Sequence, residues 1–178
     1  MVYTSNKDLL NLSLQPVGIA MINKILAFVL PLVWIVLIAS FSTHTGETSS
    51  IISQGFTRDI MHFISVFSSE LAEQIDEDSL HRQLRIFAHF TLYFFLGIWL
   101  SNAFKTIFKD WFRLWVDTSL MGLIIAISDE FYQSMVPGRF MTMNDIFTDT
   151  LGVMVGSALF ILIIHKGIKP SKKKPLSF

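Results

Sequence analysis

The sequence predicts an all-α, polytopic membrane protein with four transmembrane helices and one amphipathic helix in the first extracytoplasmic loop. Composition, long apolar runs and the placement of charge support this fold class. Hydrophobic residues make up 52% of the 178-residue chain and charged residues only 16%, and the mean hydropathy is +0.53. Soluble domains carry about 25% charged residues. The apolar residues are also gathered into runs, which indicates membrane spans.

The first predicted span covers residues 17–41 and has an apolar core at residues 25–41. This core is long enough to cross a bilayer. A cleaved signal peptide is the alternative interpretation of the segment. The core is long for a signal peptide, however, and no small-residue cleavage site follows it. We therefore expect an uncleaved helix.

Three further apolar runs predict the remaining spans, since each approaches the roughly 20 residues that a transmembrane helix needs. They cover residues 86–104, 114–132 and 146–164. The stretch from residue 42 to residue 83 is too polar to span a membrane. Apolar residues recur at helical spacing over residues 60–75, which predicts an amphipathic helix. It lies either at the membrane interface or against the other spans.

Lysine and arginine predict the orientation, because basic loops stay in the cytoplasm. The segment between the second and third spans is basic, and so is the tail after the fourth span. The first loop holds seven acids against three arginines. Both termini are therefore expected in the cytoplasm. We expect a single domain over residues 1–178, with its core at residues 25–164 and a basic cytoplasmic tail at residues 165–178.

Two compositional facts exclude other classes. The formal net charge is zero, which argues against nucleic acid as a partner. The chain has no cysteine, so it forms no disulfides, no thiolate metal sites and no cysteine nucleophile.

The predicted topology brings polar residues from three spans to the outer membrane face. These residues are His89 of the second span, Asp129, Glu130 and Gln133 of the third, Asp145 and Asp149 of the fourth, and Arg139 in the connection. An ionised side chain at membrane depth costs about 3 kcal/mol or more unless it is paired or hydrated, so such residues indicate function. In a purely structural alternative, Arg139 pairs with Glu130 or Asp145 to fix the loop.

Chemistry suggests roles for these residues. Glu130, Asp129 and His89 are the candidate catalytic groups, as acids or bases and as a proton carrier. Arg139 is a candidate anion or phosphate clamp. The other residues expected to bind a ligand are Gln133, Asp145, Asp149 and Arg85, the last lying one helical turn from His89.

Local motifs predict how the fourth span starts and packs. Thr142, followed three residues later by Asp145, predicts a capping box. Asp145, Asp149, Gly152 and Gly156 share one helix face. The spacing of Gly152 and Gly156 predicts close approach of another helix on that face.

Two segments resemble the signatures of the VanZ-like membrane proteins. The stretch SDEFYQSMVPGR at residues 128–139, followed by Asp145, Gly152 and Gly156, resembles one of them. Residues 85–93, with the Leu-Gly pair at 96–97, resemble the other, which adds Tyr93 to the candidate binding residues.

The chain departs from this family pattern at three positions, namely Ile86, Leu92 and Asp149, where the family often has Lys, Glu and Asn. The resemblance covers about residues 25–164. It implies a multi-pass protein of the bacterial cytoplasmic (inner) membrane that is linked to the cell envelope and to glycopeptide (teicoplanin-type) antibiotic resistance.

Three functions remain open from the sequence. The first is an envelope protein whose outer polar pocket binds a lipid-linked or cell-wall component, or that alters antibiotic access, with a lipid-linked cell-wall precursor or a glycopeptide as its partner. The second is an intramembrane hydrolase or transferase acting on a lipid-linked envelope precursor, and the third is a small proton-coupled transporter. No cofactor is expected, and the oligomeric state is left open.

A further alternative is a divalent metal ion, for which the oxygen ligands of Asp129, Glu130 and Asp145 would be suitable, together with His89. The spacing of these residues matches no recognised site, however, so no metal is predicted. The expected partners are the lipid bilayer and the envelope component.

Overall fold

The computed structural model describes residues 6–167, with side chains from residue 21 to residue 166. Within this part of the chain there are six helices, four of which are long and apolar enough to span a membrane. The helices are α1 (Asn6–Ser42), α2 (Gly46–Phe67), α3 (Ser69–Gln74), α4 (Glu77–Phe104), α5 (Trp111–Ser134) and α6 (Met143–Gly167). The prediction of an all-α protein with four spans is confirmed.

The four candidate spans differ from the predicted ranges: the last three extend beyond them, and the first ends at Ser42, one residue later than predicted. They are Met21–Ser42, Glu77–Phe104, Trp111–Ser134 and Met143–Lys166. The largest difference is at α4, which begins well before residue 86. Asp76 caps this helix, since its Oδ2 accepts a hydrogen bond of 3.1 Å from the amide of Ser79. Glu77 and Asp78 in the first turn also suit the positive end of the helix dipole.

The amphipathic segment before α4 forms two helices, and the prediction of one continuous helix was wrong. The break is at Ser68, whose backbone is extended (φ −160°, ψ 107°). The Ser68 hydroxyl accepts a hydrogen bond of 3.3 Å from the amide of Leu71 and so starts α3. Serine competes with the helix for backbone donors, which explains why the apolar periodicity alone missed the break.

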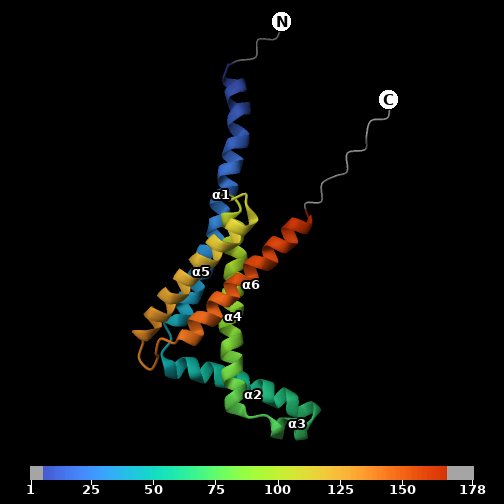
Figure 1. The fold of residues 1–178 in the computed structure, drawn as a ribbon, viewed down its shortest axis with the longest axis vertical. Coiled ribbons are helices and arrows are strands. Elements are labelled where there is room, and N and C mark those ends of the chain that lie inside the picture. Colours follow the sequence, from blue (N-terminus) through green and yellow to red (C-terminus); the bar gives the residue numbers. More distant parts are fainter. Residues whose placement is uncertain (1–5, 168–178) are drawn as a thin grey trace, which may run out of the picture.

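The helices pack with α4 at the centre of the bundle. α4 contacts α1, α2, α5 and α6, and α5 also contacts α1 and α6. α1 and α5 end where α4 and α6 begin (Figure 1), so α4 and α6 run parallel to each other. We call this end of the bundle the site end. α2 and α3 extend sideways from the site end and do not cover the bundle (Figure 1).

Three glycines bring α4 and α6 close together. A Cβ added at Gly152 would lie 2.6 Å from the carbonyl oxygen of Phe90. A Cβ added at Gly156 would overlap the carbonyl of Phe94, and one at Gly97 would overlap that of Val153. Glycine at these positions lets two backbones approach closely, as small residues do between membrane helices.

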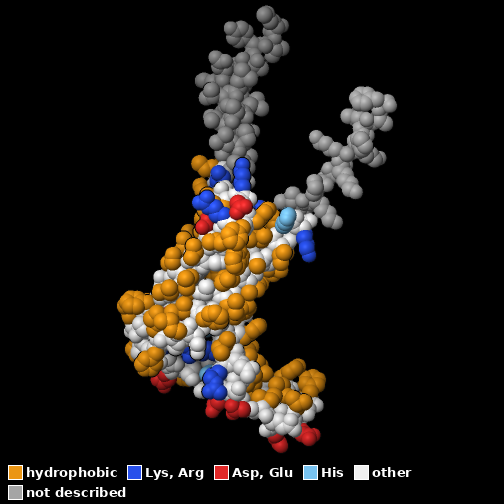
Figure 2. All heavy atoms as spheres, viewed as in Figure 1, with side chains coloured by type: hydrophobic (Ala, Val, Ile, Leu, Met, Phe, Trp, Pro, Cys, Tyr) orange, Lys and Arg blue, Asp and Glu red, His pale blue; other side chains and the backbone are white. Residues whose placement is uncertain are grey.

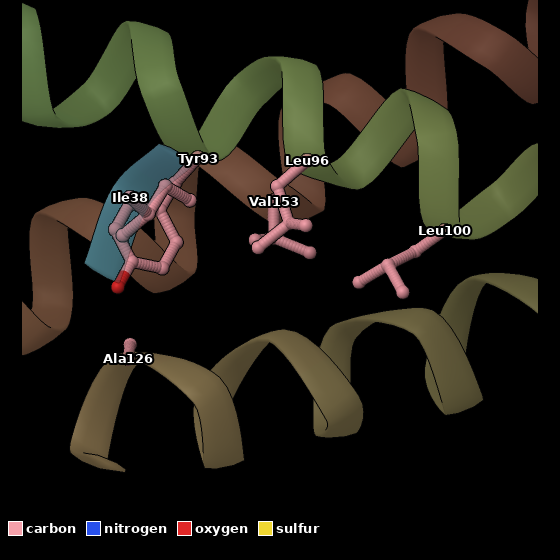
Figure 3. Close-up of a cluster of buried hydrophobic side chains, with 6 residues drawn as sticks. All are labelled: Ile38, Tyr93, Leu96, Leu100, Ala126 and Val153. Atoms are coloured by element: carbon pink, nitrogen blue, oxygen red, sulfur yellow. The ribbon is translucent and has the colours of Figure 1, made fainter. Parts of the chain in front are cut away.

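A small apolar core lies beneath this contact (Figure 3). It joins all four spans through Ile38 of α1, Tyr93, Leu96 and Leu100 of α4, Ala126 of α5 and Val153 of α6. Further from the site end, a hydrogen bond of 2.8 Å joins the buried hydroxyls of Ser101 and Ser157. The interior therefore has a polar site end, an apolar middle and a small hydroxyl cluster beyond it.

The outside of the bundle is apolar, as lipid contact requires. Large hydrophobic side chains are exposed on every span, for example Val36 at 68% and Phe112 at 73%. Figure 2 shows apolar side chains over the middle of the bundle and charged side chains towards its two ends. The chain is a multi-pass membrane protein.

Gly156→Ala tests the close contact of α4 and α6. The added methyl meets backbone, which cannot rotate away, so we expect the free energy of unfolding to fall by about 1–3 kcal/mol. Gly55→Ala is the control, because nothing lies within 4 Å of its added Cβ. The control should be neutral or slightly stabilising. Unfolding in detergent, followed by circular dichroism, measures both; equal stability of the two variants would contradict the close contact.

Candidate functional site

Two pairs of facing polar side chains join α4 and α6 at the site end. α4 carries Arg85, His89 and Tyr93 at four-residue intervals, and α6 carries Asp145 and Asp149 at the same interval. Arg85 Nη2 lies 3.2 Å from Asp145 Oδ2. His89 Nδ1 lies 3.3 Å from Asp149 Oδ1, although the two atoms are not aligned as a hydrogen bond. The parallel direction of α4 and α6 allows this repeated pairing.

Asp129 of α5 is enclosed by three hydrogen-bond donors. Its Oδ1 accepts from the Ser42 hydroxyl at 2.5 Å, and its Oδ2 accepts from Gln133 Nε2 at 2.8 Å and from the Tyr93 hydroxyl at 3.2 Å. Gln133 also donates to Ser42 Oγ at 3.2 Å. All four residues are buried. This network joins the ends of α1 and α5 to α4, and it satisfies the carboxylate fully.

Glu130 is fully buried and fixes the start of α6. Its Oε2 accepts a hydrogen bond of 3.0 Å from the amide of Thr142. Thr142 Oγ1 in turn accepts one of 3.1 Å from the amide of Asp145. Only half of the predicted capping box therefore forms. Asp145 does not return a bond to the Thr142 amide, because Glu130 occupies that donor and Arg85 binds Asp145.

Three of these residues have side-chain atoms that are buried without a hydrogen-bond partner. They are His89 Nδ1, Glu130 Oε1 and both carboxylate oxygens of Asp149. One ligand atom from each residue lies within 4.8 Å of the others, so together they could hold a metal ion. Buried polar atoms are nearly always bonded, which makes this cluster unusual within the part of the chain that the structure describes.

A cavity of about 580 Å³ opens beside these groups. Its polar lining includes Arg85, His89, Asp129, Gln133 and Arg139. Its remaining walls are largely apolar and come from α1, α2 and α4, with Ile38, Phe41, Ile52, Phe56, Leu84, Phe87 and Leu92 among them. The cavity therefore joins a charged end to a hydrocarbon-like surface.

Arg139 has no carboxylate within salt-bridge distance among residues 21–166, so the structural alternative in which it pairs with Glu130 or Asp145 is wrong. Asp145 is already bound by Arg85, and Glu130 by the Thr142 amide. Burial and the nearby Arg85 lower the pKa of Arg139, but a guanidinium stays charged in proteins. Arg139 lines this cavity and a second one of about 300 Å³. No carboxylate in the described part of the chain pairs with its donors, which leaves them available to an anion.

The structure thus brings the nine polar residues singled out from the sequence to one end of the bundle. Gly152 and Gly156 lie against α4, one helical turn and more below Asp149. Ser42 is the residue that sequence reasoning missed. It is the last residue of α1, and because α1 ends at the site end, its position was a usable signal. The backbone amide of Thr142 carried no signal of this kind.

These features define the class: a multi-pass membrane protein with a buried site of carboxylates, histidine and arginine at one end of its spans. The model of the VanZ/LLP1 family matches residues 26–164. That range is most of the chain, so the protein belongs to the VanZ/LLP1 family, as its signature segments predicted. No curated protein and no solved structure matches the chain.

Ser42→Ala tests the network around Asp129. It removes the 2.5 Å bond and leaves a buried carboxylate oxygen without its donor, so we expect a loss of about 1–3 kcal/mol of stability. Ser128→Ala is the matched control, because that exposed hydroxyl bonds only the carbonyl of Ile124. Its effect should stay within about 0.5 kcal/mol. Combining Ser42→Ala with Asp129→Asn should cost less than the sum of the single changes, and strict additivity would argue against the network.

Proposed function

We propose that this VanZ/LLP1-family protein binds an anionic, lipid-linked component of the bacterial cell envelope at its outer face. Its link to teicoplanin-type resistance or envelope maintenance follows from the VanZ-like resemblance. The observation that carries the binding proposal is the cavity of about 580 Å³, because it combines a cationic end with apolar walls. Such a cavity suits a ligand with a charged headgroup and a hydrocarbon chain.

The cationic end of the cavity supports recognition of phosphate or pyrophosphate. Among the residues that the structure describes, Arg139 has no acidic partner, and its planar guanidinium can donate two parallel hydrogen bonds to an anion. His89 lies on the same lining and can add a ring N–H donor, whereas Gln133 already donates to Ser42 and Asp129. Arg85 is already engaged by Asp145, so Arg139 is the group that we assign to the headgroup.

The position of α2 supports access from the lipid. This helix contributes Ile52 and Phe56 to the cavity and exposes Phe63, Val66 and Phe67 beyond it. Figure 2 shows apolar side chains on the bundle-facing side of the far end of α2 and α3, with acids on the other side. This arrangement is typical of a helix that lies in the membrane interface. A lipid chain could thus reach the cavity without leaving the membrane.

The placement of charge supports an outward-facing site with both termini in the cytoplasm. At the site end, the segment before α4 carries five exposed acids, and Glu77 and Asp78 in the first turn of α4 add two more. The opposite end carries Lys105, Lys109, Arg113 and Lys166. Basic segments favour the cytoplasmic side.

An intramembrane hydrolase or transferase is the second candidate, because His89 lies 3.3 Å from the carboxylate of Asp149. A histidine beside a carboxylate can act as a general base or carry a proton. Asp129 suits that role poorly, since three donors already occupy its carboxylate oxygens. Glu130 keeps one oxygen without a donor. Turnover of a lipid-linked pyrophosphate by the purified protein would favour this candidate.

The interior gives little support to a proton-coupled transporter. Such a protein needs a polar route across the membrane. Leu96, Ala126 and Val153 are fully buried between the site and the Ser101–Ser157 hydroxyl pair. This apolar layer separates the two polar regions.

A single cysteine at position 139 tests the orientation. The chain has no native cysteine, so Arg139→Cys introduces the only thiol. We expect a membrane-impermeant maleimide to label it in intact cells, because the cavity opens outwards. A cysteine at Lys109, at the opposite end, should label only after the cells are permeabilised. The reverse pattern would refute the proposed orientation.

Arg139→Gln tests binding of the anion. We expect at least a tenfold loss of affinity for a short-chain polyprenyl pyrophosphate, because a charge-assisted bond to an anion is worth about 1.5–3 kcal/mol. Arg113→Gln is the control, since Arg113 pairs with Asp117 at the opposite end. Binding to protein in lipid nanodiscs can be followed by native mass spectrometry. Equal affinities of the two variants would exclude Arg139 as the headgroup contact.

A further inference from the structure

We infer that His89, Glu130 and Asp149 form a binding site for one divalent transition-metal ion, with Zn²⁺ as the type case. The three residues come from α4, α5 and α6, so the ion would join three spans at the site end. This inference does not depend on the identity of the envelope ligand.

The geometry of the cluster supports an ion. One ring nitrogen of His89, one Glu130 oxygen and one Asp149 oxygen lie within 4.8 Å of one another. Ligands bound tetrahedrally to zinc at about 2.0–2.1 Å lie roughly 3.4 Å apart. The three side chains therefore need to move inwards by only about 1 Å to take an ion, which rotamer adjustment allows.

The unsatisfied atoms supply an independent observation. Both oxygens of the fully buried Asp149 lack a donor, and so does Glu130 Oε1. Leaving a buried carboxylate without donors is costly. The same protein gives Asp129 three donors, which shows how it stabilises a buried carboxylate by hydrogen bonds alone. At Asp149 it supplies only a misaligned histidine nitrogen, which is an arrangement suited to a metal.

The charge at the site end also fits a divalent cation. Four carboxylates, those of Asp129, Glu130, Asp145 and Asp149, gather here with the two guanidinium groups of Arg85 and Arg139. Four acids against two arginines leave an excess of two acidic groups at the site end. A divalent ion would offset this excess, and a neutral imidazole is the form that binds metals.

The hydrogen-bond and ion-pair partners of the four acids indicate which acids are free to bind the ion. Asp129 is saturated by its donors, and Asp145 is bound by Arg85. Glu130 is anchored through Oε2 to the Thr142 amide, which leaves Oε1 for the ion. The ligand set therefore differs from the one considered in the sequence, because Asp149 replaces both Asp129 and Asp145.

The ligand types indicate the class of metal. One imidazole and two carboxylates suit Zn²⁺ and its first-row neighbours, whereas Mg²⁺ and Ca²⁺ prefer oxygen ligands alone. Three protein ligands are also the number found in zinc sites that keep one position open. His89 lines the cavity as well, so the ion would lie directly behind the cavity wall.

Zn²⁺ binding to the purified full-length protein tests the inference. The protein is prepared without a histidine tag, treated with chelator and titrated with ZnCl₂ by isothermal calorimetry at neutral pH. We expect about one ion per chain. Asp149→Asn and His89→Gln should each weaken binding at least tenfold, since even partners of metal ligands contribute about 10–100-fold.

Matched controls separate this site from adventitious binding. Asp117→Asn and His165→Gln alter an acid and a histidine at the opposite end, so both should bind Zn²⁺ as the unaltered protein does. If Asp149→Asn fails to fold, His89→Gln decides, together with the thermal shift that Zn²⁺ induces in the unaltered protein only. Binding well below one ion per chain, or equal affinity in the site and control variants, would overturn the inference.

Discussion

The close parallel contact between α4 and α6 is the constraint on which the rest of the site depends. Gly97, Gly152 and Gly156 remove the side chains that would hold the two backbones apart. Because both helices start at the site end, residues of equal depth face one another along them. Arg85 then meets Asp145, and His89 meets Asp149. A wider separation would leave these groups buried without their partners, which is costly in a membrane.

The other two spans complete the site in different ways. α5 brings Asp129 and Glu130, which are adjacent in sequence but have separate roles. Asp129 turns to the end of α1 and is enclosed by Ser42, Tyr93 and Gln133. Glu130 turns to the start of α6 and holds the Thr142 amide. One acid thus stabilises the bundle, while the other keeps a free oxygen beside His89 and Asp149.

Apolar runs and basic loops were sufficient to predict four spans and the grouping of the acids at one end, because both follow from the cost of burying polar groups in lipid. Pairings within the site were not predictable in the same way. Arg139 was the expected partner of an acid, yet Arg85 takes Asp145, since it lies at the matching depth on the neighbouring helix. Ser68 broke the amphipathic helix through a local side-chain bond that periodicity does not report. Ser42, the partner of Asp129 at the end of α1, could be predicted only with knowledge of which helices are in contact.

The four carboxylates of the site differ in whether their oxygens have partners, and this difference indicates which of them bind a ligand. Hydrogen bonds or ion pairs account for Asp129 and Asp145, so these two acids explain the stability of the end of the bundle. Glu130, Asp149 and His89, in contrast, are buried with at least one side-chain atom that has no hydrogen-bond partner. Arg139, beside them on the cavity, has no acidic partner between residues 21 and 166. A site for an anionic lipid requires a cationic donor such as Arg139 beside an amphipathic cavity. A site for a cation requires acceptors without partners, such as those of Glu130 and Asp149.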